Sequence, residues 1–273
     1  MMGKKVPAFV GLDIETTGLD PHEGVILELG MVIFDHALQP LTARSWLLND
    51  WEDHPGELEP VVIEMHEQSG LFLDLISAHH PPLSEVEAHA RWWLRDNQAE
   101  HLPMLGSSIT FDRTWLATHA PRLLDTFHYR SLDATSIKLA VLAQHHNSPH
   151  LTDITHWIDD RAGQHRDRFM EALDIPEGQK RPHRVIYDIC GSAGLTIAAL
   201  ERNSSIETTE KEPHVNLRHE VEAMRADWEH KATRSASARD NSEHPAKAAH
   251  ARHLKAHQHV IRRLNKILEA DNG

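Results

Sequence analysis

The chain of 273 residues has little cysteine, no long apolar run and a shortage of positive charge. Its one cysteine, Cys190, cannot form an internal disulfide, which excludes a disulfide-stapled secreted fold. No apolar run approaches the roughly 18 residues that a membrane helix needs. The N-terminal apolar segment reaches Asp13 and Glu15 too early for a signal peptide. We therefore expect a soluble, cytoplasmic protein that has no membrane partner.

The shortage of positive charge limits the kinds of nucleic acid that the chain could bind. Lys and Arg number 28 against 41 Asp and Glu, which gives a formal net charge of −13. Nonspecific DNA binding depends on basic side chains that displace counterions from phosphates, so a DNA-coating protein is disfavoured. A small nucleic-acid substrate held through metal ions is compatible with this charge. The 24 His residues are scattered along the chain, and we interpret most of them as solvated.

Apolar patterning predicts an α/β fold. Three segments with short turns between them have the pattern of an antiparallel strand meander: 6–15, 25–34 and 41–48. A short buried strand is expected at 104–106. Helical spacing begins at Ser84, which we interpret as an N-cap with Glu87 in the capping-box position. Further helices are predicted at three places: 112–118, 132–144 and 183–202.

Two polar stretches in the second half of the chain differ from this pattern. Residues 146–182 are rich in His, Arg and Asp and are predicted to form an extended loop region with a short helix. Residues 203–273 carry 12 Lys and Arg and 11 Asp and Glu, so the negative excess belongs to residues 1–202. We expect one α/β domain over 1–202 and a helical, partly flexible tail over 203–273 that could bind an unknown partner. Two apolar stripes indicate the tail helices: Leu217, Val221, Met224 and Trp228, and Leu254, Ile261, Leu264 and Leu268.

The sharpest local feature is the pair of acids Asp13 and Glu15 at the end of the first predicted strand. Side chains alternate along a strand, so both carboxylates point to one face while Leu12 and Ile14 point to the other. Two such charges are costly unless a positive group neutralises them. Oxygen ligands suit Mg²⁺ or Mn²⁺ rather than zinc. The alternative is a solvated strand edge, which an acidic pair of this spacing also fits.

Two further positions combine acidic and basic side chains with a helix start. Asp112 follows a short apolar strand and small polar residues and stands where a helix is predicted to begin. His183 lies just ahead of the last predicted helix, which places Asp188 about one turn inside it. An Asp at a helix start can be a simple cap. A lone His-x4-Asp spacing is weakly informative.

Together these pieces resemble the DEDDh 3′→5′ exonuclease superfamily, and within it the oligoribonuclease family. The superfamily signature is Asp-x-Glu on a first strand, a later Asp at a helix start and His-x4-Asp on a late helix. Five blocks that resemble the oligoribonuclease family occur in order over residues 8–202: FVGLDIETTGLDP (9–21), MHEQSGL (65–71), GSSITFDRTWL (106–116), FHYRSLD (127–133) and HRVIYDI (183–189). The His-Tyr-Arg block separates this family from the proofreading exonucleases of DNA polymerases.

The resemblance implies an RNase H-like mixed sheet flanked by helices, a helical C-terminal extension, and a role for each matching residue. Two divalent cations, Mg²⁺ or Mn²⁺, would be held by four catalytic acids: Asp13, Glu15, Asp112 and Asp188. His183 would be the general base that takes a proton from the attacking water. Leu19 would wedge against a base. The remaining substrate contacts would come from His66, Ser108 and, across a homodimer interface, Tyr129, Arg130 and Thr135.

The implied function is metal-dependent 3′→5′ hydrolysis of short RNA, dinucleotides above all, with release of 5′-mononucleotides. Two alternatives stay open: a broader exonuclease that acts on DNA or longer RNA ends, and a non-catalytic interaction module that keeps the fold. The chain departs from the family where Val61 stands in place of an aromatic residue. It also departs in the length of 146–182 and in the tail, which has no counterpart in the family core.

Overall fold

The computed structural model describes residues 6–52 and 58–204 of the chain. The predicted tail helices lie outside the described residues. The division between a domain at 1–202 and a tail at 203–273 therefore stays a prediction. Within the described ranges, no helix combines the length and the apolar character that a membrane crossing requires.

The core of the fold is a five-stranded mixed sheet in the order β3-β2-β1-β4-β5. Its strands are β1 (Pro7–Thr16), β2 (Ile26–Asp35), β3 (Pro40–Leu47), β4 (Met104–Gly106) and β5 (Ser131–Asp133). The first three strands pair antiparallel, which confirms the predicted meander. The two short strands run parallel to β1. The α/β class and the mixed sheet flanked by helices are thus confirmed.

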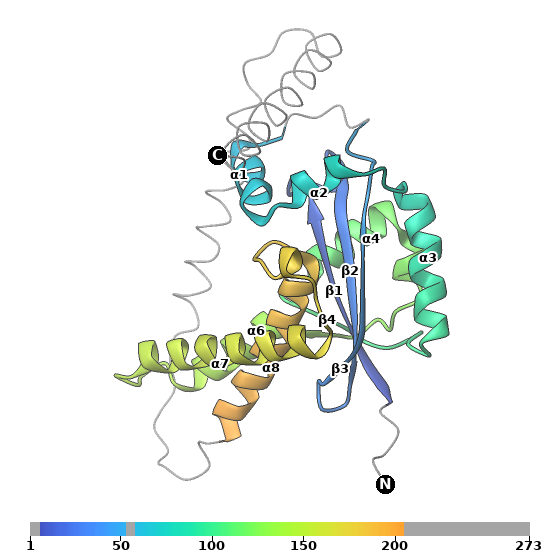
Figure 1. Cartoon of the computed structure of the whole chain (residues 1–273). Helices are drawn as coiled ribbons and strands as arrows, with labels where there is room; N and C mark the ends of the chain where they lie inside the picture. The colour runs from blue at the N-terminus through green and yellow to red at the C-terminus, as the bar shows by residue number, and fades with distance from the viewer. Residues whose placement is uncertain (1–5, 53–57, 205–273) are drawn as a thin grey trace.

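Helices cover both faces of the sheet, as Figure 1 shows. One face packs against α3 (Leu83–Asp96), α4 (Thr110–His119) and α5 (Pro121–Leu124). The other face packs against α8 (Val185–Ser204), which is flanked by α6 (Ala134–Gln144) and α7 (Leu151–Ala172). Two short helices, α1 (Pro60–Ser69) and α2 (Leu71–Ser77), lie at the end of the sheet where β1 finishes. A 3-10 turn, η1 (Glu177–Gln179), precedes α8.

Two glycines let α8 approach the sheet closely. Gly11 on β1 and Gly30 on β2 lie on the face that α8 covers. A Cβ at Gly11 would collide with Ile189, and a Cβ at Gly30 would collide with Val185. Because neither glycine has a side chain, the first turns of α8 lie directly on β2 and on β1, the strand that carries the acidic pair.

The structure corrects the predicted start of α3. The helix begins at Leu83 rather than after a Ser84 cap, and the backbone N–H of Leu83 donates to Asp50 Oδ2 at 2.7 Å. Glu87 closes no capping box. Its Oε1 accepts hydrogen bonds from the backbone N–H groups of Arg122 (2.8 Å) and Leu123 (3.1 Å) at the start of α5. Hydrogen bonds between residues distant in sequence thus take the place of the predicted capping box between Ser84 and Glu87.

Two further segments differ from the prediction. Residues 131–133, of which 132–133 were assigned to a helix, pair with β4 as a parallel strand, and α6 begins only at Ala134. Residues 146–182 are not mainly loop, because 151–172 form the long helix α7. Its polar residues face solvent, while a stripe at helical spacing packs inward: Ile154, Ile158, Ala162, His165 and Phe169. This stripe is narrow and is interrupted by a histidine, which is why apolar periodicity missed it.

Candidate active site

The acidic pair lies at the carboxyl end of β1, on the face that α8 covers. Leu12 and Ile14 point to the opposite face, into the core beneath α3 and α4, as the alternation of a strand requires. Glu15 is 6% exposed and Asp13 is partly buried. Neither acid therefore lies on a solvated strand edge.

Asp112 is brought to the same place by the connection that follows β4. It lies in the first turn of α4, is buried, and accepts hydrogen bonds from its own backbone N–H and from that of Ile14. A side chain at the end of β5 holds this connection in place through a hydrogen bond. Asp133 Oδ2 accepts the backbone N–H of Ile109 at 2.9 Å, while its Oδ1 accepts that of Ser136 at 2.7 Å. The carboxyl ends of three neighbouring strands thus converge on one edge of the sheet.

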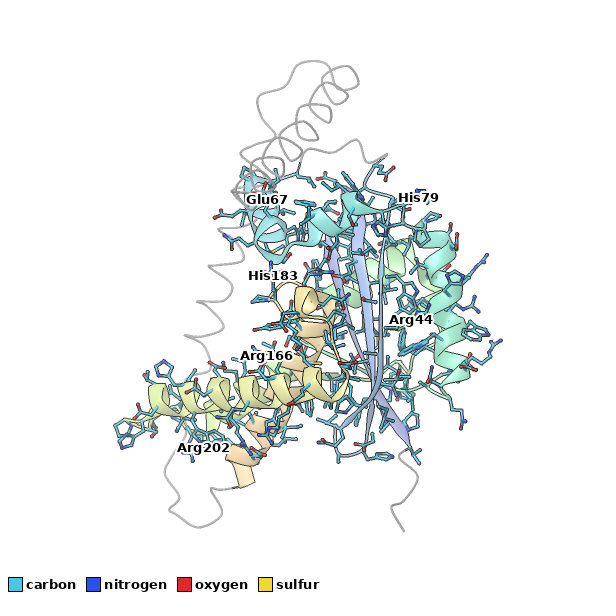
Figure 2. All side chains as sticks on the ribbon, in the orientation of Figure 1. Arg44, Glu67, His79, Arg166, His183 and Arg202 are labelled. Carbon is cyan, nitrogen blue, oxygen red and sulfur yellow. The ribbon has the colours of Figure 1, made fainter. Side chains whose placement is uncertain are left out.

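The last two predicted catalytic residues come from the start of α8. The backbone N–H of His183 donates to Asp188 Oδ2 at 2.9 Å, which ties the residue before the helix to its first turn. His183 is exposed and has a left-handed backbone with φ of 61°. Figure 2 places it at the end of α8 that faces α1. Ligand atoms of Glu15, His183 and Asp188 lie within 4.8 Å of one another.

Burial and mutual repulsion dominate the electrostatics of the four acids. Burial raises the pKa values of Asp112 and Asp188 to about 7. The pKa of Asp13 is raised well above its usual range by burial and then by the charges of Asp112, Asp188 and Glu15. The pKa of Glu15 is likewise raised by burial and by Asp188. Four carboxylates that repel one another at one point form an oxygen donor set that suits divalent cations such as Mg²⁺.

His183 has the protonation state of a base at neutral pH. Although the residue is exposed overall, partial desolvation of its imidazole lowers the pKa below the usual value of 6.5. The ring is therefore mainly neutral at pH 7 and can accept a proton. A neutral imidazole beside a group of acids is suited to general base chemistry. A structural ion pair with these acids would instead require the charged imidazole.

His66 is completely buried, which differs from an open base-contacting position. Its Nε2 lies 3.1 Å from the carbonyl oxygen of Thr16, and its Nδ1 lies 3.8 Å from Glu15 Oε2. The turn that follows holds the ring in place, because Gly70, with φ of 78°, ends α1 and lets Phe72 pack edge-on against the imidazole. In this arrangement His66 supports the end of β1 through Thr16 and lies beside the carboxylate of Glu15.

The other predicted substrate contacts lie on the surface. Leu19 is 52% exposed in the turn after β1, and Ser108 is exposed in the connection to α4 with φ of 55°. Tyr129 is 72% exposed, and the Arg130 guanidinium lies 5.4 Å from the centre of its ring. Thr135 is half-buried in the first turn of α6. Their predicted roles toward substrate stay predictions.

Sequence reasoning missed a buried ionic network next to these residues. Arg184, which follows His183, forms ion pairs with Glu28 on β2 and Asp74 on α2. Asp133, which fixes the connection to α4, was read only as part of a motif. Glu28 could have been suspected, because it is the one charged residue inside an apolar strand whose only other charge, Asp35, is at the last position. Nothing in the sequence pairs it with Arg184.

Comparisons with known proteins place the chain among nucleases. No family model matches it. It is 34% identical over 134 residues to an oligoribonuclease of Colwellia psychrerythraea, which covers 47% of this chain and 72% of that protein. An oligoribonuclease of Alkalilimnicola ehrlichii is 34% identical over 140 residues, covering 50% and 72% respectively. An oligoribonuclease of a Mycobacterium species is 31% identical over 137 residues, covering 47% and 61%.

Similar solved structures include two of exonuclease I. A product-bound structure has a TM-score of 0.47 at 12% identity and covers 74% of this chain and 45% of that chain. The E. coli enzyme in complex with a 5cy-dT13 oligonucleotide has a TM-score of 0.48 at 13% identity, covering 74% and 42%.

Proposed function

Because this chain belongs to the oligoribonuclease family and is a 3′→5′ exoribonuclease, we propose that it acts on the shortest RNA fragments and releases 5′-mononucleotides. Dinucleotides are its preferred substrates in this proposal, and the cytoplasm is its compartment. The observation that carries the proposal is the convergence of four acids and one neutral histidine at one edge of the sheet.

The four acids would hold two divalent cations, Mg²⁺ or Mn²⁺. Such cations, when bound, stabilise the attacking and leaving oxygens of an in-line phosphoryl displacement. The donor set fits them, because carboxylates with raised pKa values lose their repulsion when a cation is bound. A hard oxygen-rich set of this kind does not favour zinc.

The chain's own residues would handle the proton and orient the site. His183, neutral at pH 7, takes the proton from the water that attacks the terminal phosphodiester. Asp188 has a second task, because its Oδ2 holds the backbone N–H of His183 at 2.9 Å and so fixes the residue that carries the base. His66 supports Glu15 from within the core.

The preference for short RNA is inferred from charge and from the proposed subunit arrangement. Residues 1–202 hold the negative excess of the chain, so a long polyanion gains little from contacts outside the cation site. In a homodimer, Tyr129, Arg130 and Thr135 of a second subunit would grip the far phosphate of a dinucleotide. A third nucleotide would then collide with this cap.

The length profile of hydrolysis tests the proposal. We expect 5′-labelled RNA of two nucleotides to be hydrolysed faster than RNA of five, and RNA of 20 to be hydrolysed slowest, with Mg²⁺ or Mn²⁺ present and no turnover after chelation. Equal or faster turnover of the 20-mer would replace the proposal with a broader exonuclease. Asp112→Asn and Asp13→Ala should each abolish turnover without unfolding the chain. Full activity of either variant would overturn the site assignment.

A further inference from the structure

The residue after the proposed base is a fully buried arginine. Arg184 is 1% exposed and its guanidinium forms a two-pronged contact with Glu28, with Nε to Oε2 at 3.0 Å and Nη2 to Oε1 at 3.3 Å. Its Nη1 donates to Asp74 Oδ2 at 2.7 Å and to the carbonyl oxygen of Gly178 at 3.4 Å. A buried arginine needs this many partners, because an unpaired charge in the interior is very costly.

The partners of Arg184 come from three separate parts of the fold. Glu28 is on the central strand β2, Asp74 is on α2, and Gly178 is in the 3-10 turn η1 before α8. The planar guanidinium fixes direction as well as charge, because both oxygens of Glu28 are engaged. The backbone at residue 184 is therefore anchored to the sheet, to α2 and to the turn at once.

This anchor stands directly beside an unfavourable backbone conformation. His183 has φ of 61°, which is costly for a residue with a side chain and persists only where the surroundings hold it. Its own N–H is held by Asp188 at 2.9 Å, and the next residue is held by Arg184's partners. His183 is thus fixed from both sides, although its ring is exposed.

Glu28 also lies next to the catalytic acids. It is the cross-strand partner of Glu15 in the antiparallel register and points to the same face of the sheet. A fifth carboxylate at this point would add to the repulsion between the acids, and Arg184 supplies the opposite charge. The ion pair therefore belongs to the site's architecture, although within the described part of the chain Arg184 pairs with Glu28 and Asp74 rather than with any of the four acids.

We propose that Glu28, Arg184 and Asp74 form a positioning network that holds His183 in the backbone conformation needed for proton transfer. The inference rests on the proposed function, because it assigns the network to the same site and step. Arg184 is a positioning residue here, since its bonds are to protein partners and it acts through its neighbour. Asp74 is the most suitable member of the network to replace, because its side chain is 44% exposed whereas those of Glu28 and Arg184 are each 1% exposed.

The first experiment compares Asp74→Asn with a matched control, Asp159→Asn. Asp159 on α7 is similarly exposed and also pairs with a cation, Lys138 Nζ at 2.6 Å, but it lies outside the network of Arg184. On a 5′-labelled RNA dinucleotide at saturating Mn²⁺, we expect Asp74→Asn to lower kcat about tenfold with KM within about twofold. The control should match the wild type. Equal kcat values for the two variants would overturn the proposal.

A second experiment separates positioning from a general structural role. In a His183→Ala background, Asp74→Asn should change the residual single-turnover rate less than about twofold, because the group that it positions is gone. The same tenfold loss in that background would overturn the proposal.

Amide hydrogen exchange gives a measurement that is independent of activity. Asp74→Asn should speed amide exchange at residues 183–185, whereas Asp159→Asn should not. Equal protection of these amides in the two variants would also overturn the proposal.

The wild-type enzyme in the same assay keeps the two proposals distinct. If the wild type and His183→Ala degrade the dinucleotide equally well, the proposed role of His183 fails. If the wild type is active and His183→Ala is not, but Asp74→Asn is fully active, the positioning inference alone fails. Arg184→Lys is a further variant to test, because lysine keeps the positive charge but cannot form the bidentate hydrogen bonds of the guanidinium with Glu28. Full activity of Arg184→Lys would show that charge suffices, and would overturn a role in geometry.

Discussion

His66 illustrates at the residue scale how burial couples the site to stability. The fold lowers the pKa of its imidazole to about 4, mainly because the buried ring cannot be hydrated when charged. The unfolded chain takes up this proton near pH 6.5. The neutral ring therefore contributes stability that is fully present above pH 6.5 and is lost as pH falls through about 4.

His66→Gln is predicted to remove this pH dependence, because glutamine carries no titrating group and can still donate to the carbonyl oxygen of Thr16. The wild-type free energy of unfolding should fall relative to that of the variant by on the order of 3 kcal/mol between pH 7 and pH 4. Urea unfolding at several pH values, without divalent cations, measures the difference. A difference that is constant with pH would contradict the buried neutral state.

Residue-scale prediction from sequence succeeded where a short-range rule decides the geometry. The alternation of a strand was enough to place Asp13 and Glu15 on one face, with Leu12 and Ile14 in the core. It failed for Arg184, because its partner Glu28 is 156 positions away and only the folded chain brings the two together. The burial of His66 against Glu15 depends in the same way on how α1 folds over the end of β1.

At the scale of elements, the distance between α8 and the sheet decides whether Asp188 reaches the other acids. Gly30→Ala should push α8 outward, because the added Cβ would collide with Val185 in its first turn. We expect a loss of about 1–3 kcal/mol in the free energy of unfolding. We also expect kcat to fall at least about tenfold, because Asp188 and His183 move with the helix.

Gly163→Ala on α7 is the matched control for this prediction. Its Cβ would meet Arg166 at 3.7 Å, which is an ordinary contact. Alanine should therefore leave activity unchanged and stabilise the helix by about 0.5–1 kcal/mol. Thermal unfolding and dinucleotide turnover of both variants test the predicted changes in stability and activity. Wild-type kcat in Gly30→Ala would mean that close packing of α8 does not position the site.

The elements that sequence predicted well have strong, regular patterns. The three long strands and the short strand β4 follow from apolar runs between turns. The segment that became β5 resembled a helix start, because its pairing partner β4 is supplied by the fold rather than by local sequence. The start of α3 was misplaced for a similar reason. Asp50 and Glu87 satisfy backbone groups of other segments, so capping rules based on neighbours in sequence did not apply.

At the scale of the whole molecule, an acidic enzyme that cleaves a polyanion must concentrate its positive charge in bound cations. In the cation-free protein the four acids destabilise the fold when they are ionised. Because burial raises the pKa values of Asp112 and Asp188 from 3.8 to about 7, the folded state binds more protons than the unfolded state between these two values. Their favourable contribution is thus present at low pH and is lost as pH rises through about 7.

Divalent cations should reverse this loss, and by more at alkaline pH. At pH 8 the acids are ionised and Mn²⁺ replaces repulsion with attraction, whereas at pH 5.5 it must first displace protons from Asp112 and Asp188. We expect the rise in Tm on adding one fixed concentration of Mn²⁺ to be clearly larger at pH 8. The reason is that binding weakens about tenfold per unit of pH for each proton displaced.

The titration of His66 affects the protein with and without Mn²⁺ equally at each pH, so it cancels from the rise in Tm. NaCl at the same ionic strength controls for screening. A rise in Tm that is equal at the two pH values, or larger at pH 5.5, would mean that Mn²⁺ does not bind at these acids.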